Sequence, residues 1–315
     1  MAYLRGPGKS PWPGSVAGMI LGAHVPGDDP LKEAKSVGAE CLQMFVGPPQ
    51  SWKKPPPRDD AEVLKASPLP VYVHAPYLIN VASPNNRVRI PSRKILANTL
   101  ERAQEIGAAA VIVHGGHAED GVEHGFRRWW KVFEEMGEPP VPIYIENTAG
   151  GDNAMARRVD VLAKLWEMLE EFEVGFCFDT CHAHAAGEDL EDVMKRVLEA
   201  TGRIDLVHAN NSRDKPGSGA DRHENFEKGQ IEIDAIVERI PPPGQAALIG
   251  PYVERRLQEI LPEARVRVAH EALARVGRGD APLRGRAVGG VVVADQAQPV
   301  LEALGEALVD HRAVE

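Results

Sequence analysis

The sequence predicts an α/β protein built as a TIM (β/α)8 barrel, and three observations support this prediction. The chain has 315 residues, which is enough for one barrel and a tail. From about Met19, short runs rich in Val and Ile alternate with amphipathic stretches of helical period, as in βαβ units. Ionisable residues end several of these apolar runs. Together these features favour a parallel barrel with polar groups on one face.

Seven short apolar runs are the candidate strands. Two of the intervening helices are clear from their pattern: residues 92–107, which Ser92 can cap and Gly107 can end, and residues 159–172. Seven units are one short of a complete barrel. The predicted strands are MILGAHV (19–25), CLQMFV (41–46), PVYVHAP (70–76), AAVIVHG (109–115), PIYIENT (142–148), VGFCFDT (174–180) and IDLVHAN (204–210).

Three segments of different composition follow one another along the chain. Residues 1–18 are rich in Gly and Pro and predict a flexible N-terminal arm that lacks the apolar core of a secretory signal. Residues 19–240 hold the barrel motifs. Residues 241–315 form a divergent C-terminal segment without Lys, Ser, Thr, Asn, Phe, Trp, Met or Cys. Two origins would explain this change in composition: a segment appended to the barrel, or a stretch of the gene that is translated in a different reading frame from the ancestral one.

The divergent segment must nevertheless supply the eighth barrel unit. Its pattern predicts strands over residues 265–272 and 289–295 and helices over 251–261 and 298–310. The sequence alone does not decide which of these completes the barrel.

Composition limits the class of protein. The formal net charge of −10 argues against a protein that coats nucleic acid nonspecifically, but it allows a DNA enzyme whose positive field is local. The chain has three cysteines, Cys41, Cys177 and Cys181, and their spacing matches no disulfide scaffold. We therefore expect free thiols in a reducing compartment. No stretch approaches the roughly 20 apolar residues of a membrane span. We therefore expect a cytoplasmic protein.

Five ionisable residues each end a different predicted strand, from the third to the seventh. Any one of them could be a satisfied buried side chain, but five in succession are hard to explain by packing. The carboxyl ends of the strands are also the face where such barrels carry their active sites. These residues are His74, His114, Glu146, Asp179 and His208.

Further imidazoles and carboxylates stand close to this set. FDTCH places His182 near Asp179, and ADRHENF places Asp221 and His223 two residues apart, so that both can point the same way in an extended loop. Such groups suit zinc and, with more oxygen, manganese. Eight candidate ligands exceed one tetrahedral site and predict two or three ions. Clustered ions suit phosphodiester hydrolysis.

Seven motifs make the resemblance to a known family specific. GAHV, VHAPYLIN, VHGGH, IENTAG, FDTCHAHAAG, LVHANNS and DRHENFEKG occur in the order and spacing of the endonuclease IV (deoxyribonuclease IV) family, from about Met19 to Ile233. The resemblance implies a TIM barrel with three zinc ions, or manganese at one site, that hydrolyses DNA 5′ to an abasic site and trims blocked 3′ ends. It implies double-stranded abasic DNA as the partner, and we expect a monomer.

The resemblance also assigns roles to residues, with Glu146 at the centre of catalysis. By motif, His74 and His114 would bind the first ion, Glu146 would bridge the first and second, Asp179 and His208 would bind the second, and His182, Asp221 and His223 would hold the third. His24 and His117 lie near these positions and are expected to orient ligands.

Four residues are expected to contact DNA. Tyr77 and Leu78 match the positions that the family inserts into the duplex, as base-flipping enzymes do, although loop anchoring would also explain them. Gln50 stands where the family commonly has an intercalating Arg, and Arg222 can contact a phosphate. Five further cations could form a positive rim, although each alone is more typical of a solvated surface: Lys53, Lys54, Arg87, Arg89 and Arg213.

One departure from the family concerns its ninth metal ligand, a glutamate at the end of the eighth strand in a motif resembling LET. Glu254 lies at the right distance but in a predicted helix, and Glu271 follows a predicted strand but comes late. Two alternatives therefore stay open. One is a noncatalytic protein that binds abasic DNA, and the other is a sugar isomerase or epimerase with one metal ion on the related barrel.

Overall fold

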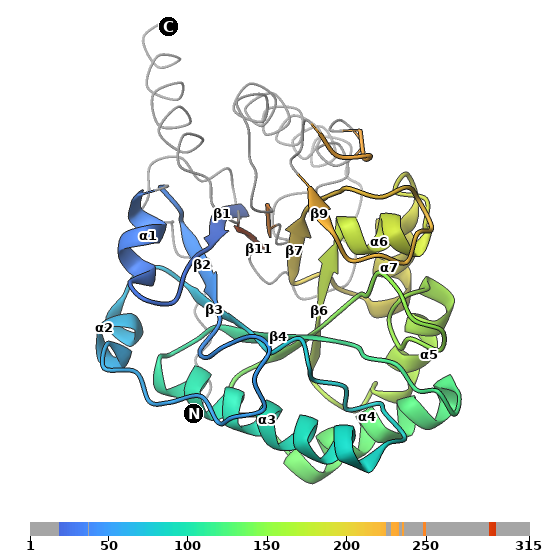
Figure 1. The fold of residues 1–315 in the computed structure, drawn as a ribbon, viewed down its shortest axis with the longest axis horizontal. Coiled ribbons are helices and arrows are strands. Elements are labelled where there is room, and N and C mark those ends of the chain that lie inside the picture. Colours follow the sequence, from blue (N-terminus) through green and yellow to red (C-terminus); the bar gives the residue numbers. More distant parts are fainter. Residues whose placement is uncertain are drawn as a thin grey trace, which may run out of the picture.

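The computed structural model shows a closed ring of parallel strands with helices on its outside (Figure 1). It describes residues 19–36, 38–224, 228–232, 235, 248–249 and 290–293. The predicted (β/α)8 barrel is confirmed by the order of its strands. Within the described part of the chain, no helix has the length and apolar character to cross a membrane.

All seven predicted strands form, and each pairs in parallel with the next one in the chain. The side chains of the second to seventh strands are almost entirely buried, because helices cover one face and the barrel interior the other. The strands are β1 (Met19–His24), β2 (Cys41–Met44), β3 (Val71–His74), β4 (Ala110–His114), β5 (Ile143–Glu146), β6 (Val174–Asp179) and β7 (Leu206–Ala209).

Two short strands share the eighth position in the ring. β11 (Gly290–Val293) lies between β1 and β7 and pairs in parallel with both. β10 (Leu248–Ile249) pairs with β7 one step further along, opposite His208 and Ala209. Both strands come from the part of the chain after residue 240, and β11 falls within the predicted strand 289–295.

Other expectations for the two ends of the chain lie outside the described residues. They are the N-terminal arm over residues 1–18, the strand over 265–272, the helices over 251–261 and 298–310, and the candidate ligands Glu254 and Glu271.

The helices between the strands pack on the outside of the ring, as Figure 1 shows for α1 to α5. Trp129, Phe126 and Phe133 on α4 are fully buried against the sheet. The described helices are α1 (Pro30–Ser36), α2 (Ala61–Ala66), α3 (Asn86–Glu105), α4 (Val122–Met136), α5 (Val159–Met168), α6 (Thr180–Ala186) and α7 (Val193–Thr201).

The predicted boundaries of two helices were wrong. α3 begins at Asn86 rather than at Ser92, because the Asn85 side chain caps it by accepting a hydrogen bond from the backbone N–H of Arg87 at 2.9 Å. The Ser92 hydroxyl instead accepts from the backbone N–H of Asn80 at 2.9 Å and ties the preceding loop to the helix. α5 ends at Met168, short of residue 172.

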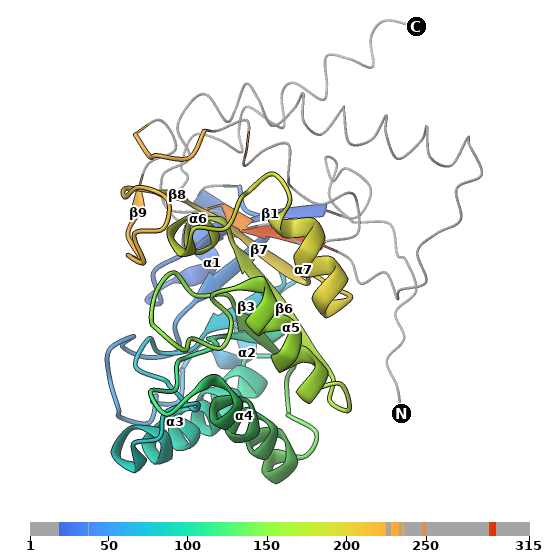
Figure 2. The ribbon, with the colours of Figure 1, turned by 90° about the vertical axis from the view of Figure 1, so that its right-hand side faces the viewer.

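No disulfide joins the three cysteines, as predicted, and all three side chains are buried: Cys41, Cys177 and Cys181. On the face where the strands end, α6 lies beside a small antiparallel hairpin of β8 (Asn211–Ser212) and β9 (His223–Glu224) (Figure 2). This hairpin extends the barrel at the carboxyl ends of β6 and β7.

Ending the chain after Gly289 removes β11, which leaves β1 without a partner on that side and β7 with only the two-residue pairing to β10. We expect this variant to aggregate or to unfold at a clearly lower urea concentration, since unpaired edges expose backbone groups. A chain that ends after Ala294 keeps β11 and is the matched control. Equal urea midpoints and equal elution in gel filtration for the two would show that β11 does not close the ring.

Candidate metal centre

The five predicted strand-end residues meet at one end of the barrel. Four of them are the last residues of β3 to β6, and His208 is the next-to-last residue of β7. Parallel pairing places His114 beside Glu146 and Asp179 beside His208. The closed ring therefore brings together side chains that are far apart in sequence.

Glu146 is the centre of the cluster, with 1% of its surface exposed. Its Oε2 lies 3.1 Å from His74 Nε2 and 3.4 Å from His114 Nε2. Its Oε1 lies 2.7 Å from His208 Nδ1 and 3.4 Å from His182 Nδ1. A carboxylate with imidazoles on both oxygens has the geometry of a group that bridges two ions.

The remaining residues form the other side of the cluster. Asp221 Oδ1 lies 3.0 Å from His182 Nε2 and 3.3 Å from His223 Nε2. Asp179 Oδ2 lies 3.7 Å from both His223 Nε2 and His208 Nδ1. All eight candidate ligands thus lie in one continuous network.

Local structure explains the FDTCH motif. Asp179 ends β6 and caps α6, where its Oδ1 accepts a hydrogen bond from the backbone N–H of His182 at 2.8 Å. The first turn of α6 then carries the His182 ring back over the barrel mouth. One residue therefore ends a strand, starts a helix and keeps a second oxygen for the site.

Backbone carbonyls fix two of the imidazoles. Nδ1 of His74 donates to the Ala75 carbonyl at 2.7 Å, and Nδ1 of His182 donates to the Asn147 carbonyl at 2.8 Å. In each neutral ring this leaves the lone pair on Nε2, which faces the cluster. Histidine ligands in metal sites are oriented in this way.

Two asparagines that the sequence analysis missed support Asp179. Asn210 Nδ2 donates to Asp179 Oδ2 at 2.6 Å, and the Asn147 side chain bonds both the N–H and the C=O of Asp179. Both asparagines are buried. Their positions just after strand ends, in IENT and VHAN, are the signal that could have identified them.

The donor set fits divalent metal ions. Nε2 of His182 and Nε2 of His223 are buried and converge on Asp221 Oδ1, at 3.0 and 3.3 Å, an arrangement of three donor atoms that can close around one cation. Imidazole nitrogens, carboxylate oxygens and one thiol come within 4.8 Å of one another in four overlapping groups. These are His74, His114 and Glu146; His114, His182 and Asp221; Glu146, Cys177 and His208; and Asp179, His182 and His223.

The charges within the cluster depend on one another. Burial opposes the ionisation of Glu146, but His208 and His114 outweigh it and hold its pKa well below the usual range. Burial also opposes protonation of His182, yet Asp179 and Asp221 raise its pKa well above the ordinary value. For His114, burial dominates and lowers the pKa to about 4. When no metal ion is bound, protons shared between the imidazoles and the carboxylates compensate the negative charge of the carboxylates.

The four residues expected to contact DNA differ in how exposed they are and in whether they have partners within the protein. Tyr77 is 50% exposed, and its ring centroid lies 5.4 Å from that of His74 and 5.8 Å from that of His114. Leu78 is partly buried and Gln50 is exposed. Arg222 is half exposed, and its Nε donates to Asp214 at 2.6 Å.

Two cations of the predicted positive rim, and one histidine expected to orient ligands, have partners away from the eight candidate ligands. Lys54 pairs with Glu101 at 2.7 Å, and Arg89 donates to the carbonyls of Ser83 and Pro84. His117 contacts Asn80 and Glu119, neither of which is among the eight candidate ligands.

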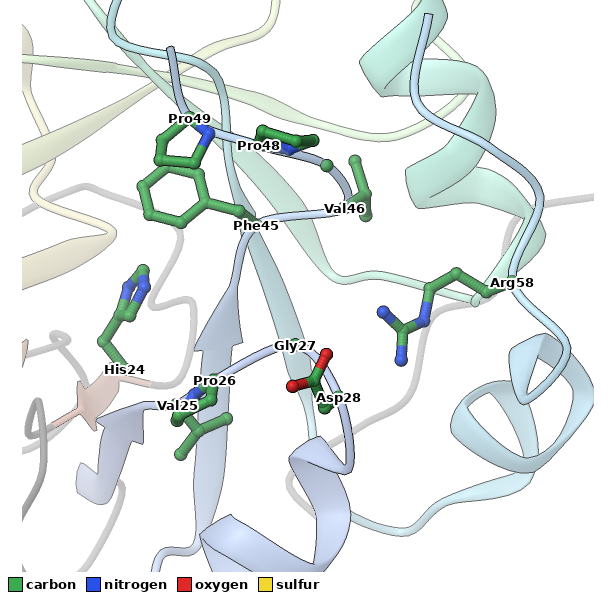
Figure 3. Close-up of a pocket in the computed structure, with 11 residues that line it drawn as sticks. His24, Val25, Pro26, Gly27, Asp28, Phe45, Val46, Pro48, Pro49 and Arg58 are labelled. Atoms are coloured by element: carbon green, nitrogen blue, oxygen red, sulfur yellow. The ribbon is translucent and has the colours of Figure 1, made fainter. Parts of the chain in front are cut away.

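A pocket of about 560 Å3 opens beside the centre, between the loops that follow β1 and β2 (Figure 3). Phe45 separates it from His74, with ring centroids 5.3 Å apart. Arg58 reaches into the pocket, while its Nε and one terminal nitrogen donate to Asp60. Arg58 was not predicted to line a pocket, because it stands in a proline-rich loop without a recognisable sequence pattern.

Sequence comparisons agree with this geometry. A family model described as "Xylose isomerase-like TIM barrel" matches residues 31–249. "Probable endonuclease 4" of Mycobacterium tuberculosis (strain ATCC 25177 / H37Ra) is 58% identical over 244 residues, which cover 77% of this chain and 96% of the relative. The chain belongs to the endonuclease IV family. A second endonuclease IV family relative, "Probable endonuclease 4" of Mycobacterium leprae (strain TN), is 54% identical over the same shares of the two chains.

Structural comparisons place the chain with the same endonuclease IV family. The crystal structure of endonuclease IV from Thermus thermophilus superposes with a TM-score of 0.63 at 25% identity, covering 93% of this chain and 98% of that one. A D-tagatose 3-epimerase-like protein has a TM-score of 0.57 at 16% identity, with 90% and 94% covered. At that identity the second likeness shows a shared barrel and nothing about the reaction.

The buried histidines predict how acid affects the metal-free protein. His114 has its pKa lowered from 6.5 to about 4 and His24 from 6.5 to about 3, both by burial. Below pH 6.5 the unfolded chain takes up these protons while the folded chain does not, so stability falls as the pH drops toward 4. We expect the urea midpoint to decrease steadily over this range.

The His114→Asn variant is the control, because it lacks one of the two groups and should lose stability less steeply. A urea midpoint that stays level or rises between pH 6.5 and 4.5 would contradict the assignment of neutral, buried rings.

Proposed function

We propose that this protein is a metal-dependent endonuclease that hydrolyses the phosphodiester 5′ to abasic sites in double-stranded DNA and trims blocked 3′ ends. The observation that carries the proposal is the buried Glu146 carboxylate with two imidazoles on each oxygen, at the active-site face of the barrel. Membership in the endonuclease IV family supports the same reaction.

The proposed cofactors are three zinc ions, with manganese as an alternative at one site. Bound ions of this kind activate water near neutral pH and stabilise a departing oxygen. We assign His74 and His114 to the first ion, Asp179 and His208 to the second, His182, Asp221 and His223 to the third, and Glu146 to a bridge between the first two.

The residues of the chain prepare this site before substrate arrives. Glu146 is ionised because its pKa is held low, and His114 is neutral at physiological pH because burial lowers its pKa. Both are therefore ready to bind cations. Occupied by divalent ions, the cluster carries positive charge that attracts a phosphodiester, although the net charge of the whole chain is −10.

Around the centre, we assign contacts with the damaged duplex to four residues. The half-exposed ring of Tyr77 stands over His74 and His114, where it can stack on a base beside the lesion. Leu78 follows it in the same loop. Gln50 is assigned to the opposing strand, and Arg222, oriented by Asp214, to a phosphate.

We also propose a cytoplasmic monomer. The absence of a disulfide among the three buried cysteines suits a reducing compartment.

The direct test is cleavage of a duplex with one synthetic abasic site. We expect the zinc- or manganese-loaded protein to nick it on the 5′ side and a chelator to stop the reaction. The Glu146→Gln variant removes the charge that bridges two imidazole pairs and should lower the rate by on the order of 100-fold or more. Glu188→Gln, at another buried glutamate that pairs with Arg158 and Arg196, is the matched control.

Two other outcomes would replace this function. A folded, metal-loaded protein that binds abasic DNA selectively without nicking it would be a damage-binding protein. One ion per chain by elemental analysis, without nicking, would favour a sugar isomerase or epimerase. Three ions per chain agree with the nuclease.

Tyr77→Ala should weaken binding to an abasic duplex by roughly 10-fold or more, because a base stacked on an aromatic ring is worth about 1–3 kcal/mol. Binding to an intact duplex should change little. Tyr77→Phe keeps the ring and should bind like the wild type, and Val63→Ala removes another exposed apolar side chain as a surface control. Fluorescence anisotropy measures all four proteins. Unchanged affinity in Tyr77→Ala would assign this loop to packing alone.

A further inference from the structure

Gln43 is a polar residue inside an otherwise apolar strand. It lies on β2 with 3% of its surface exposed, between Leu42 and Met44. Burying a carboxamide is costly unless its hydrogen bonds are made. Gln43 makes two: its Oε1 lies 3.0 Å from His208 Nε2, and its Nε2 lies 2.9 Å from His24 Nδ1.

The contact with His208 determines which ring nitrogen carries a proton. A carboxamide oxygen only accepts, so His208 must donate from Nε2. In the neutral ring the lone pair is then on Nδ1. That atom lies 2.7 Å from Glu146 Oε1, with which it shares a second proton when no cation is present, and 3.7 Å from Asp179 Oδ2. In the other tautomer an N–H would point at the same place and repel a cation.

His24 fixes which way the carboxamide faces. Its Nδ1 lies 2.9 Å from Gln43 Nε2, and a carboxamide nitrogen only donates, so Nδ1 accepts and the ring proton of His24 is on Nε2. Burial lowers the pKa of His24 to about 3, so the ring is neutral at physiological pH. The ring also packs edge-on against Phe45, with centroids 4.9 Å apart, in the wall of the pocket that Figure 3 shows. A chain of hydrogen bonds thus runs from β1 through β2 to β7.

We propose that Gln43 is a positioning residue of the metal centre: its carbonyl selects the His208 tautomer that binds an ion through Nδ1, and His24 holds the carboxamide in the required orientation. The inference rests on the metal centre of the proposed function. It adds a residue that contacts no ion and no substrate, yet determines whether one ligand can bind.

Two substitutions separate hydrogen bonding from packing. Gln43→Met keeps the length of the side chain but removes the acceptor, and Gln43→Glu keeps an acceptor for His208. Each zinc-loaded protein is titrated with a chelating dye that reports zinc affinity. We expect Gln43→Met to bind one ion roughly 10–100-fold more weakly, or to lose it on dialysis, and Gln43→Glu to retain it. Wild-type zinc content and affinity in Gln43→Met would overturn the proposal.

A spectroscopic measurement keeps the proposal testable if Gln43→Met does not fold. Long-range 1H–15N correlation spectra of the zinc-loaded wild type should show a proton on His208 Nε2 and none on Nδ1. A protonated Nδ1 would overturn the assignment. The buried Thr99→Val substitution, on α3, removes another internal hydrogen bond and should leave zinc affinity unchanged.

These results are independent of the cleavage assay. A wild-type protein that binds zinc but does not nick abasic DNA would defeat the proposed function and leave the role of Gln43 standing. Full zinc affinity in Gln43→Met, together with normal nicking, would defeat only the role of Gln43.

Discussion

A carboxylate removed from water needs charged or hydrogen-bonding neighbours, and Glu146 has four imidazoles within 3.4 Å of its two oxygens. Those rings come from four different segments, so the charge can be balanced only when β3, β4, β5, β7 and the start of α6 are all in place. The same arrangement attracts cations, because a carboxylate surrounded by ring lone pairs is also a bridge between ions. Stability of the barrel mouth and affinity for metal are therefore linked through one side chain.

Much of this arrangement could be predicted from the sequence, because the spacing of apolar residues identifies the strands and the ionisable residues stand at the strand ends. Segments of six or seven residues predicted all seven strands of the barrel wall, which are four to six residues long in the structure. The ionisable residues at the ends of the third to seventh strands had to face one another, since parallel strands share one carboxyl edge. The same reasoning placed Asp221 and His223 on one side of an extended segment, where both contact His182 or Asp179.

Features that depend on tertiary contacts were not visible in the pattern. α3 begins six residues before the predicted start, because Ser92 serves the loop at Asn80 and leaves the capping to Asn85. Gln43 was given no role from the sequence, and only the position of β7 shows its contact with His208. Arg58 reaches its pocket from a loop whose path no local rule specifies. The divergent composition after residue 240 also hid which segment pairs with β1.

The position of β11 has a consequence for synthesis of the protein. Met19 pairs with Gly290, so nearly the whole chain must be synthesised before β11 is available to pair with β1. At about 5–20 residues per second, a ribosome needs on the order of 10 s to pass from β7 to the end of β11. During that interval the nascent sheet has two open edges, which are sites for pairing with other chains. Late closure of the ring therefore makes newly made chains more prone to pair with one another than finished ones.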